Sequence, residues 1–122
     1  MTNANRNYWG WGRADFAFPT EIRERFKMML QGLLQIKSFE QVQPKNVDEL
    51  QLRNPRFSLP SPLASICSHS NFDRASHSYG KAFRDVWRGL QGQFPNPPDY
   101  VAFPKSEDDI IQLMQFASTE GI

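Results

Sequence analysis

Hydrophobic residues recur at three- and four-residue steps in residues 20–37. Those on the repeating face are Ile22, Phe26, Met29, Leu30, Leu33 and Ile36. This spacing predicts an amphipathic helix with one apolar face. Thr20, which follows Pro19, is the expected N-cap. Gly32 in the interior costs up to about 1 kcal/mol relative to alanine.

A second periodic stretch covers residues 71–91 and predicts one further helix, ended by Gly92 and Pro95. Its apolar side carries Ala75, Tyr79, Phe83, Val86, Trp87 and Leu90. Another side carries the basic or imidazole side chains Arg74, His77, Lys81, Arg84 and Arg88. We expect this basic side to be a solvated face. Contact with an anionic ligand or with a partner's acidic residues is the alternative.

The last periodic stretch joins a short strand to a helix. Residues 99–103 lie between two prolines and predict a strand, and Ser106 and Asp109 form a capping box for the helix that follows. We expect Ile110, Leu113, Met114 and Ala117 to form its buried face, and Gly121 to end it. A strand followed closely by a helix is typical of the start of a βαβ unit. Since no second strand follows, we expect the backbone of 99–103 to have no partner within this chain.

The remaining segments lack this periodicity. Residues 1–19 form an aromatic arm in which Trp9 and Trp11 need apolar cover, either from the chain's own core or from a larger body. Residues 38–62 contain Pro44, Pro55, Pro60 and Pro62 and predict an extended loop. Within that loop, Asn46 and Glu49 predict a capping box for a short helical turn over residues 47–52.

Composition narrows the function classes. The chain has 122 residues, which is enough for one small domain. With 14 basic and 13 acidic residues its net charge is +1, which argues against a nucleic-acid binder and against a polybasic membrane anchor. No stretch approaches the roughly 20 apolar residues of a transmembrane helix. Cys67 is the only cysteine, so no internal disulfide is possible, and this fits a reducing compartment.

Candidate chemistry is sparse. Cys67, His69 and His77 have a spacing that matches no standard zinc site, and no third group orients a cysteine–histidine nucleophile pair. The chain contains no dinucleotide fingerprint, Walker loop or nucleophile elbow. From the residues we therefore assign no catalytic and no metal-binding residue, and the roles of Arg74, His77 and Arg88 stay open.

Two stretches carry a family resemblance. They are "YWGWG" at residues 8–12, and a later run with Arg74, His77, Gly80, Asp85, Arg88–Gly89 and Pro98-Asp99-x-Val101-x-x-Pro104. Both resemble alkyldihydroxyacetonephosphate synthase and its FAD-linked oxidase relatives, flavoproteins of the vanillyl-alcohol-oxidase type. The resemblance covers most of residues 8–122 and is loose over 38–70.

The resemblance implies an α+β chain. Residues 1–95 would be the aromatic arm and a mainly helical segment, and residues 96–122 the first strand and helix of a VAO/PCMH-type FAD-binding domain. In the family a Gly-rich loop that binds the FAD pyrophosphate follows. The chain therefore resembles the N-terminal part of a longer flavoenzyme, and we expect it to be inactive and to bind no FAD alone. Pro104 is at most a neighbour of residues that contact the cofactor.

The implied activity is ether-lipid synthesis, in which a fatty alcohol replaces the acyl group of acyl-dihydroxyacetone phosphate with FAD as cofactor. An FAD-linked 2-hydroxy-acid oxidoreductase and a stand-alone helical interaction module are the alternatives. The expected partner is the downstream remainder of the enzyme, with self-association as a further expectation. The few residues before "WGWG" favour a cytoplasmic protein, with membrane association as an alternative.

Overall fold

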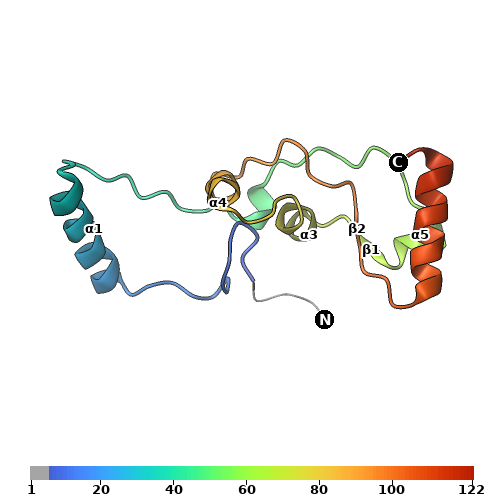
Figure 1. Ribbon diagram of the computed structural model, residues 1–122, viewed down its shortest axis with the longest axis horizontal. Coiled ribbons are helices and arrows are strands. Elements are labelled where there is room, and N and C mark those ends of the chain that lie inside the picture. The colour runs from blue at the N-terminus through green and yellow to red at the C-terminus, as the bar shows by residue number, and fades with distance from the viewer. Residues whose placement is uncertain (1–5) are drawn as a thin grey trace.

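A computed structural model describes residues 6–122 and shows an elongated molecule. In Figure 1, α1 stands at one end, α3 and α4 lie at the centre, and α5 stands at the opposite end beside a two-stranded sheet. The elements in chain order are α1 (Thr20–Leu34), a 3-10 turn η1 (Val47–Glu49), α2 (Ser61–Ala64), β1 (Cys67–Ser68), α3 (Asn71–Ser76), α4 (Phe83–Leu90), β2 (Val101–Ala102) and α5 (Glu107–Glu120). This helix-rich fold with one small sheet is compatible with the predicted α+β class.

The predicted first helix is present as α1. It ends at Leu34 because Gln35 adopts a left-handed conformation with φ 54°. The prediction that Thr20 caps the helix is wrong: Pro19 holds the N-cap position, and Thr20 is the first helical residue. No residue of α1 is buried. The amphipathic pattern therefore predicted the helix correctly, but no other part of the chain buries its apolar face.

The hydrophobic core lies at the centre of the molecule. Its buried residues are Tyr8, Leu50, Ala75 and Phe94. The ring of Phe94 contacts Tyr8 at a centroid distance of 6.0 Å and stacks on Tyr79 at 5.4 Å. The core thus joins the aromatic arm, the segment after η1, α3 and the segment after α4. Because these segments are far apart in sequence, they depend on one another for burial.

The prediction of one helix over residues 71–91 is wrong, since the structure has two. α3 stops at Ser76, and the hydroxyls of Ser76 and Ser78 donate to the carbonyls of Phe72 and Arg74 at 2.7 Å. Serine hydroxyls that bind nearby carbonyls compete with helical hydrogen bonds. Lys81 then has a φ of 65°, a left-handed conformation that no continuous helix accommodates.

α4 also differs from prediction in what it buries. Phe83 is 86% exposed and Trp87 48% exposed, so the expected apolar side of the second helix is only partly covered. The loop after α4 fits the predicted stop: Gly92 has a φ of 71°, and its N–H donates to the carbonyl of Gly89 at 3.0 Å. Because of the break, the apolar side chains of α3 and those of α4 face different surfaces of the molecule.

The expected parallel strand without a partner is also wrong. β2 has two residues and pairs antiparallel with β1, with Cys67 opposite Ala102 and Ser68 opposite Val101. The N–H of Phe103 also donates to the carbonyl of Ile66 at 2.8 Å. The partner strand β1 lies between α2 and α3, in a part of the chain that carries no strand pattern.

α5 confirms the predicted caps. The N–H of Asp109 donates to Oγ of Ser106 at 3.2 Å, the N–H of Ser106 donates to Oδ2 of Asp109 at 3.1 Å, and Gly121 adopts φ 68°. The expected buried face is wrong, because no residue of α5 is buried. Ile110 and Met114 are 48% and 69% exposed. α5 instead turns Phe116 toward Phe57, with ring centroids 6.0 Å apart.

The capping box at Asn46 is confirmed in a shorter turn than predicted. The backbone N–H of Asn46 donates to Oε2 of Glu49 at 3.1 Å, and η1 covers three residues, Val47–Glu49. Within the part of the chain that the structure describes, no helix is long and apolar enough to cross a membrane.

Candidate functional site

The polar centre of the structure is the carboxylate of Asp99, which lies two residues before β2. Its Oδ1 accepts hydrogen bonds from Nη1 of Arg53 at 2.5 Å and from the backbone N–H of Arg56 at 3.0 Å. Its Oδ2 accepts from Nε and Nη2 of Arg56 at 2.9 and 2.7 Å. Both carboxylate oxygens are therefore fully engaged. We call Arg53, Arg56, Arg74 and Asp99 the Asp99 cluster.

The neighbouring arginines and burial shift the pKa of this carboxylate in opposite directions. Asp99 is only 6% exposed. Its burial alone would raise the pKa, but the hydrogen bonds from Arg56 and Arg53 outweigh burial and hold the pKa of Asp99 well below its usual range. Asp99 is therefore ionised throughout the neutral range. Within the cluster, Asp99 is a fixed anion held by the guanidinium groups of Arg53 and Arg56.

Arg74 lies beneath this ion pair and is 3% exposed. Its Nε donates to the carbonyl of Pro98 and its Nη2 to the carbonyl of Arg53, both at 2.7 Å. Burial and the neighbouring charge of Arg53 lower the pKa of Arg74 below its ordinary value, while Asp99 opposes them. The expected solvated basic face is thus wrong for Arg74. This residue fastens α3 to the two extended segments that build the cluster.

The aromatic arm docks on the other side of the core. Tyr8 is buried, and its hydroxyl donates to the carbonyl of Lys45 at 2.8 Å. Nζ of Lys81 donates to the carbonyl of Tyr8 at 2.5 Å, and burial lowers the pKa of Lys81. A Cβ on Gly89 of α4 would lie 3.0 Å from the carbonyl oxygen of Trp9. The glycine therefore permits close approach of the arm, and Lys81 fixes it.

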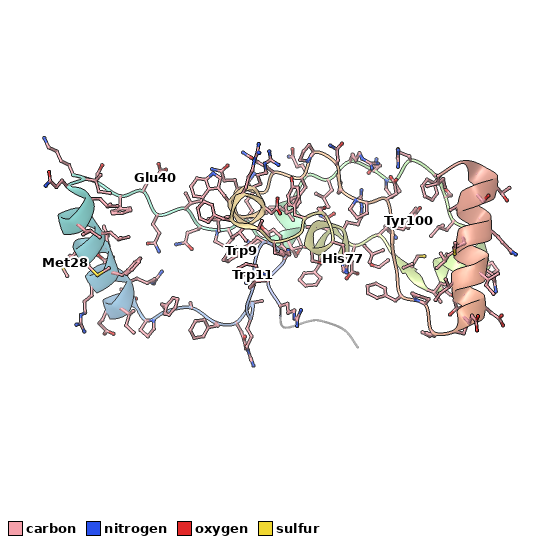
Figure 2. The ribbon with its side chains drawn as sticks, viewed as in Figure 1. Trp9, Trp11, Met28, Glu40, His77 and Tyr100 are labelled. Carbon is pink, nitrogen blue, oxygen red and sulfur yellow. The ribbon has the colours of Figure 1, made fainter. Side chains whose placement is uncertain are left out.

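The second tryptophan of the arm behaves differently. Trp9 packs against the core as a partly buried residue, whereas Trp11 is 76% exposed. Figure 2 shows both side chains near the centre of the molecule. The expectation that both rings find apolar cover therefore holds within this chain only for Trp9.

The other candidate residues do not form a reactive group. His77 and His69 are exposed, with their rings edge-on to Phe103 at 6.2 Å and Tyr100 at 6.1 Å. Burial raises the pKa of the Cys67 thiol, which disfavours the nucleophilic thiolate. Among residues 6–122 no group of three or more His, Cys, Asp or Glu side chains has an arrangement that could hold a metal ion.

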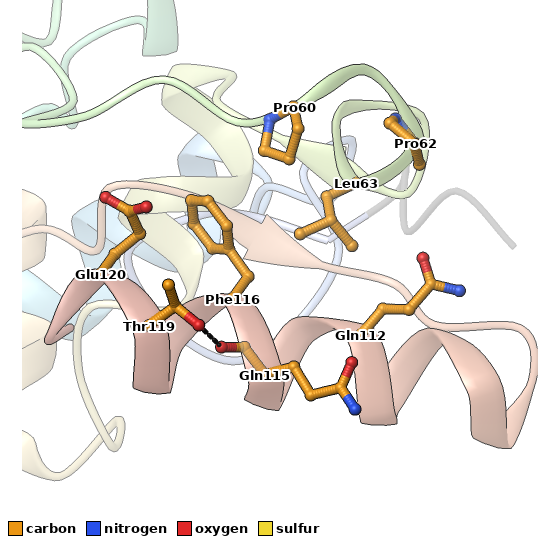
Figure 3. A pocket seen from close by; sticks show the side chains of 8 residues that line it. All are labelled: Pro60, Pro62, Leu63, Gln112, Gln115, Phe116, Thr119 and Glu120. Atoms are coloured by element: carbon orange, nitrogen blue, oxygen red, sulfur yellow. Dashed lines mark hydrogen bonds between the residues drawn. The ribbon is translucent and has the colours of Figure 1, made fainter.

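A pocket of about 300 Å³ lies between α2 and α5 (Figure 3). Its lining residues are Pro60, Pro62, Leu63, Gln112, Gln115, Phe116, Thr119 and Glu120. The only ionisable group among them is a carboxylate, and Oγ1 of Thr119 is engaged with the carbonyl of Gln115 at 2.9 Å. A pocket lined in this way does not suit a phosphate-bearing ligand.

The described residues also do not fit an FAD site by themselves. A pyrophosphate cradle needs several successive backbone N–H groups in a turn free of side chains. The glycines with left-handed backbone, Gly12, Gly92 and Gly121, stand singly and far apart in the sequence. Pro104 is exposed between β2 and α5 and borders no such cradle. We derive no chemical step through a flavin from these residues.

Solvent-exposed apolar side chains lie on two helices, α4 and α5. Phe83 and Trp87 are exposed on α4, and Ile110, Ile111 and Met114 on α5. Large apolar patches on a small protein are typical of surfaces that another body covers. We call these two surfaces the α4 and α5 faces.

The chain is similar to two curated proteins that bear the same name, alkyldihydroxyacetonephosphate synthase. The chain is 29% identical over 108 residues to alkyldihydroxyacetonephosphate synthase of Dictyostelium discoideum. The aligned region makes up 88% of this chain and 17% of that enzyme. It is 35% identical over 51 residues to alkyldihydroxyacetonephosphate synthase of Trypanosoma brucei brucei, and this aligned region makes up 42% of this chain and 8% of that enzyme. The chain thus spans less than a fifth of the length of these curated relatives. No family model matches the chain, and no solved structure matches it significantly.

Sequence reasoning missed Arg53 and Arg56, which hold Asp99 from 46 and 43 residues away. No local periodicity relates these positions. The available signal was composition: two arginines three residues apart in a proline-rich loop, and an aspartate after two prolines. Such a pattern indicates ion pairing without saying which charges meet.

Proposed function

We propose that this chain is the N-terminal part of an alkyldihydroxyacetonephosphate synthase-like, FAD-dependent enzyme. The supporting observation is the similarity to the Dictyostelium synthase, which extends over 88% of the chain. The proposed reaction replaces the acyl group of acyl-dihydroxyacetone phosphate with a fatty alcohol. We assign none of its chemical steps to residues 6–122. FAD, when bound to such an enzyme, would supply the electrophilic centre of the exchange.

Within this proposal the Asp99 cluster positions the polypeptide that leads into the cofactor domain. Asp99 precedes Tyr100 and β2, and Arg53 and Arg56 fix its position against the loop. The hydroxyl of Tyr100 also donates to the carbonyl of Phe57 at 2.8 Å, next to the arginines. The direction of β2 and the start of α5 are therefore set by contacts with residues 53–57. Such an anchor gives the N-terminal segment a structural role in a larger enzyme.

The partner in this proposal is the remainder of the enzyme. The α4 face exposes aromatic side chains at the centre of the molecule, and the α5 face exposes aliphatic side chains at one end. Burying them stabilises the assembly by about 25 cal/mol per Å² of apolar surface. We expect the chain to bind the downstream body of a synthase through these faces, and to self-associate when that body is missing.

Reconstitution tests the proposal. The Dictyostelium synthase would be produced without its matched N-terminal segment, alone and together with this chain as a separate polypeptide. We expect the chain to co-purify with the truncated enzyme and to restore incorporation of labelled fatty alcohol into alkyldihydroxyacetone phosphate. A chain with Phe83→Ser on the α4 face should co-purify less, whereas Gln112→Ala, on the side of α5 opposite Ile110 and Met114, should behave as the parent.

Two results would contradict the proposal. Oxidation of a 2-hydroxy acid by the reconstituted enzyme, with no fatty-alcohol incorporation, would favour the oxidoreductase alternative. A stable monomeric chain that binds no truncated synthase would favour an interaction module with another partner.

A further inference from the structure

The gap between α3 and α4 has no sufficient local cause. Residues 77–82 contain no proline, and Gly80 is the single residue among them with a strong preference against helix. The serine hydroxyls loosen the end of α3, but helical hydrogen bonding continues beyond it, since the N–H of His77 donates to the carbonyl of Asp73 at 3.1 Å. The sequence of residues 71–90 therefore permits one continuous helix.

The chain leaves the helical path at residues 79–81, and there it gives up hydrogen bonds. Among the described residues, the backbone N–H groups of Tyr79, Gly80 and Lys81 donate to no backbone carbonyl. In a continuous helix they would donate to the carbonyls four residues earlier. Lys81 in addition has a φ of 65°, a conformation that is unfavourable for a residue with a Cβ. A tertiary contact must compensate for this geometry.

The aromatic arm supplies that contact through Tyr8. Nζ of Lys81 donates to the carbonyl of Tyr8 at 2.5 Å, and the Lys81 side chain is half-buried. The Tyr8 ring is buried against Phe94, which in turn stacks on Tyr79 at 5.4 Å. The arm thus contacts one end of the break directly and reaches the other end through Phe94.

The arm also covers the one buried residue of α4. That residue is Gly89, and an added Cβ there would lie 3.0 Å from the carbonyl oxygen of Trp9. The large apolar side chains of the helix gain little burial, because Phe83 and Trp87 are exposed. The present position of α4, which Figure 1 shows beside α3 at the centre of the molecule, therefore depends on the arm rather than on a packed apolar face of its own.

We propose that the aromatic arm is a strap that keeps α3 and α4 apart, and that residues 71–90 form one continuous helix when the arm undocks. Ala75, Tyr79 and Phe83, at four-residue steps, would then share one face of that helix. The α4 face would turn with the helix, so docking of the arm sets the direction in which this face points. The inference does not rest on the synthase assignment, because every contact in it lies within this chain.

Two substitutions of one residue separate the strap from the backbone preference. Lys81→Ala and Lys81→Gly both remove the hydrogen bond to Tyr8. Alanine keeps the cost of the left-handed conformation and is the best helix former, whereas glycine adopts that conformation freely and disfavours a helix. A second pair acts from a distance. Gly89→Ala places a Cβ against Trp9 in the arm, and Gly32→Ala makes the same change on α1, where no atom lies within 4 Å.

NMR spectroscopy of the full chain measures the outcome. Backbone carbon chemical shifts and amide-to-amide nuclear Overhauser effects of residues 77–82 report whether these residues are helical, and the indole N–H resonance of Trp9 reports whether the arm is docked. In the parent we expect helical values for α3 and α4 with a non-helical gap between them. The gap should become helical in Lys81→Ala and Gly89→Ala, and should persist in Lys81→Gly and Gly32→Ala.

Three results would overturn the proposal. Helical values across residues 77–82 in the parent would show that the docked arm does not keep the helices apart. A gap that persists after the Trp9 resonance shows an undocked arm would make the break a property of residues 77–82 themselves. Loss of helical values over the whole of residues 71–90 in Lys81→Ala and Gly89→Ala would show that the arm stabilises the helices rather than the break between them.

Discussion

Replacing Asp99 with asparagine removes the charge that Arg53 and Arg56 surround while keeping the size of the side chain. The new amide would place its N–H groups against a guanidinium group, because in the parent Arg53 donates to Oδ1 and Arg56 donates to Oδ2. Breaking a buried ion pair costs about 3–5 kcal/mol. Arg56 is 68% exposed and Arg53 35% exposed, so solvent compensates part of that loss for the arginines. We therefore expect Asp99→Asn to lower the free energy of unfolding by about 2–3 kcal/mol.

Urea titration followed by tryptophan fluorescence measures this loss, since Trp9 packs on the core. Asp15→Asn is a matched control, because Asp15 also pairs with an arginine, Arg13, but both side chains are more than half exposed. An exposed pair of this kind contributes little to stability, because water screens the two charges. Equal stability of the parent and Asp99→Asn, or an equal loss in both variants, would refute the role given to the Asp99 cluster.

The same carboxylate predicts a pH dependence. The pKa of Asp99 is depressed in the folded chain, so its contribution to stability is complete above the unfolded-state pKa, about 3.9. It is lost as the pH falls below that value toward the folded pKa. The stability difference between parent and Asp99→Asn should therefore be constant between pH 6 and 8 and shrink below about pH 4. A difference that is unchanged on acidification would contradict the ionised state of Asp99.

Three further predictions concern the arm, the glycines and the cofactor. Gly89→Ala should destabilise the chain, because the added Cβ would lie 3.0 Å from the backbone of Trp9. Gly32→Ala should stabilise α1 by up to about 1 kcal/mol, because a Cβ at this position would have no atom within 4 Å. Urea titration of both variants measures these opposite changes. Trp9→Ala should cost about 2–3 kcal/mol and Trp11→Ala less than about 1 kcal/mol in this chain, and equal losses would contradict the docking of the arm. The purified chain mixed with excess FAD should retain no flavin absorption after gel filtration, and a stoichiometric flavin band would refute the absence of a pyrophosphate cradle.

The elements that sequence reasoning placed correctly are those with local causes. α1 and α5 follow from apolar periodicity, and the Ser106–Asp109 box and Gly121 set the ends of α5. These signals act within one or two helical turns, so they can be recognised without knowledge of the fold. Whether a periodic face is covered is a different question. Periodicity predicted an apolar face on α1 and a buried face on α5, yet neither helix contains a buried residue.

The features that were missed depend on contacts between distant segments. β2 pairs with Cys67–Ser68, two residues without strand character, so register and direction were not readable from the strand itself. The break between α3 and α4 depends on Lys81, whose left-handed backbone is held by its hydrogen bond to the arm at Tyr8. The sequence pattern placed Arg74 on a solvated basic face, whereas its guanidinium group is buried and donates to the carbonyls of Arg53 and Pro98. In each case tertiary contacts overrode a local preference.

A chimeric synthase tests the central proposal most directly. The matched N-terminal segment of the Dictyostelium synthase would be replaced by this chain, and incorporation of labelled fatty alcohol into alkyldihydroxyacetone phosphate would be measured. The account predicts incorporation by the chimera and its loss in the enzyme without any N-terminal segment, with Asp99→Asn reducing the amount of active enzyme. A chimera that folds and retains flavin but incorporates no fatty alcohol would contradict the assignment of this chain to a synthase-like enzyme.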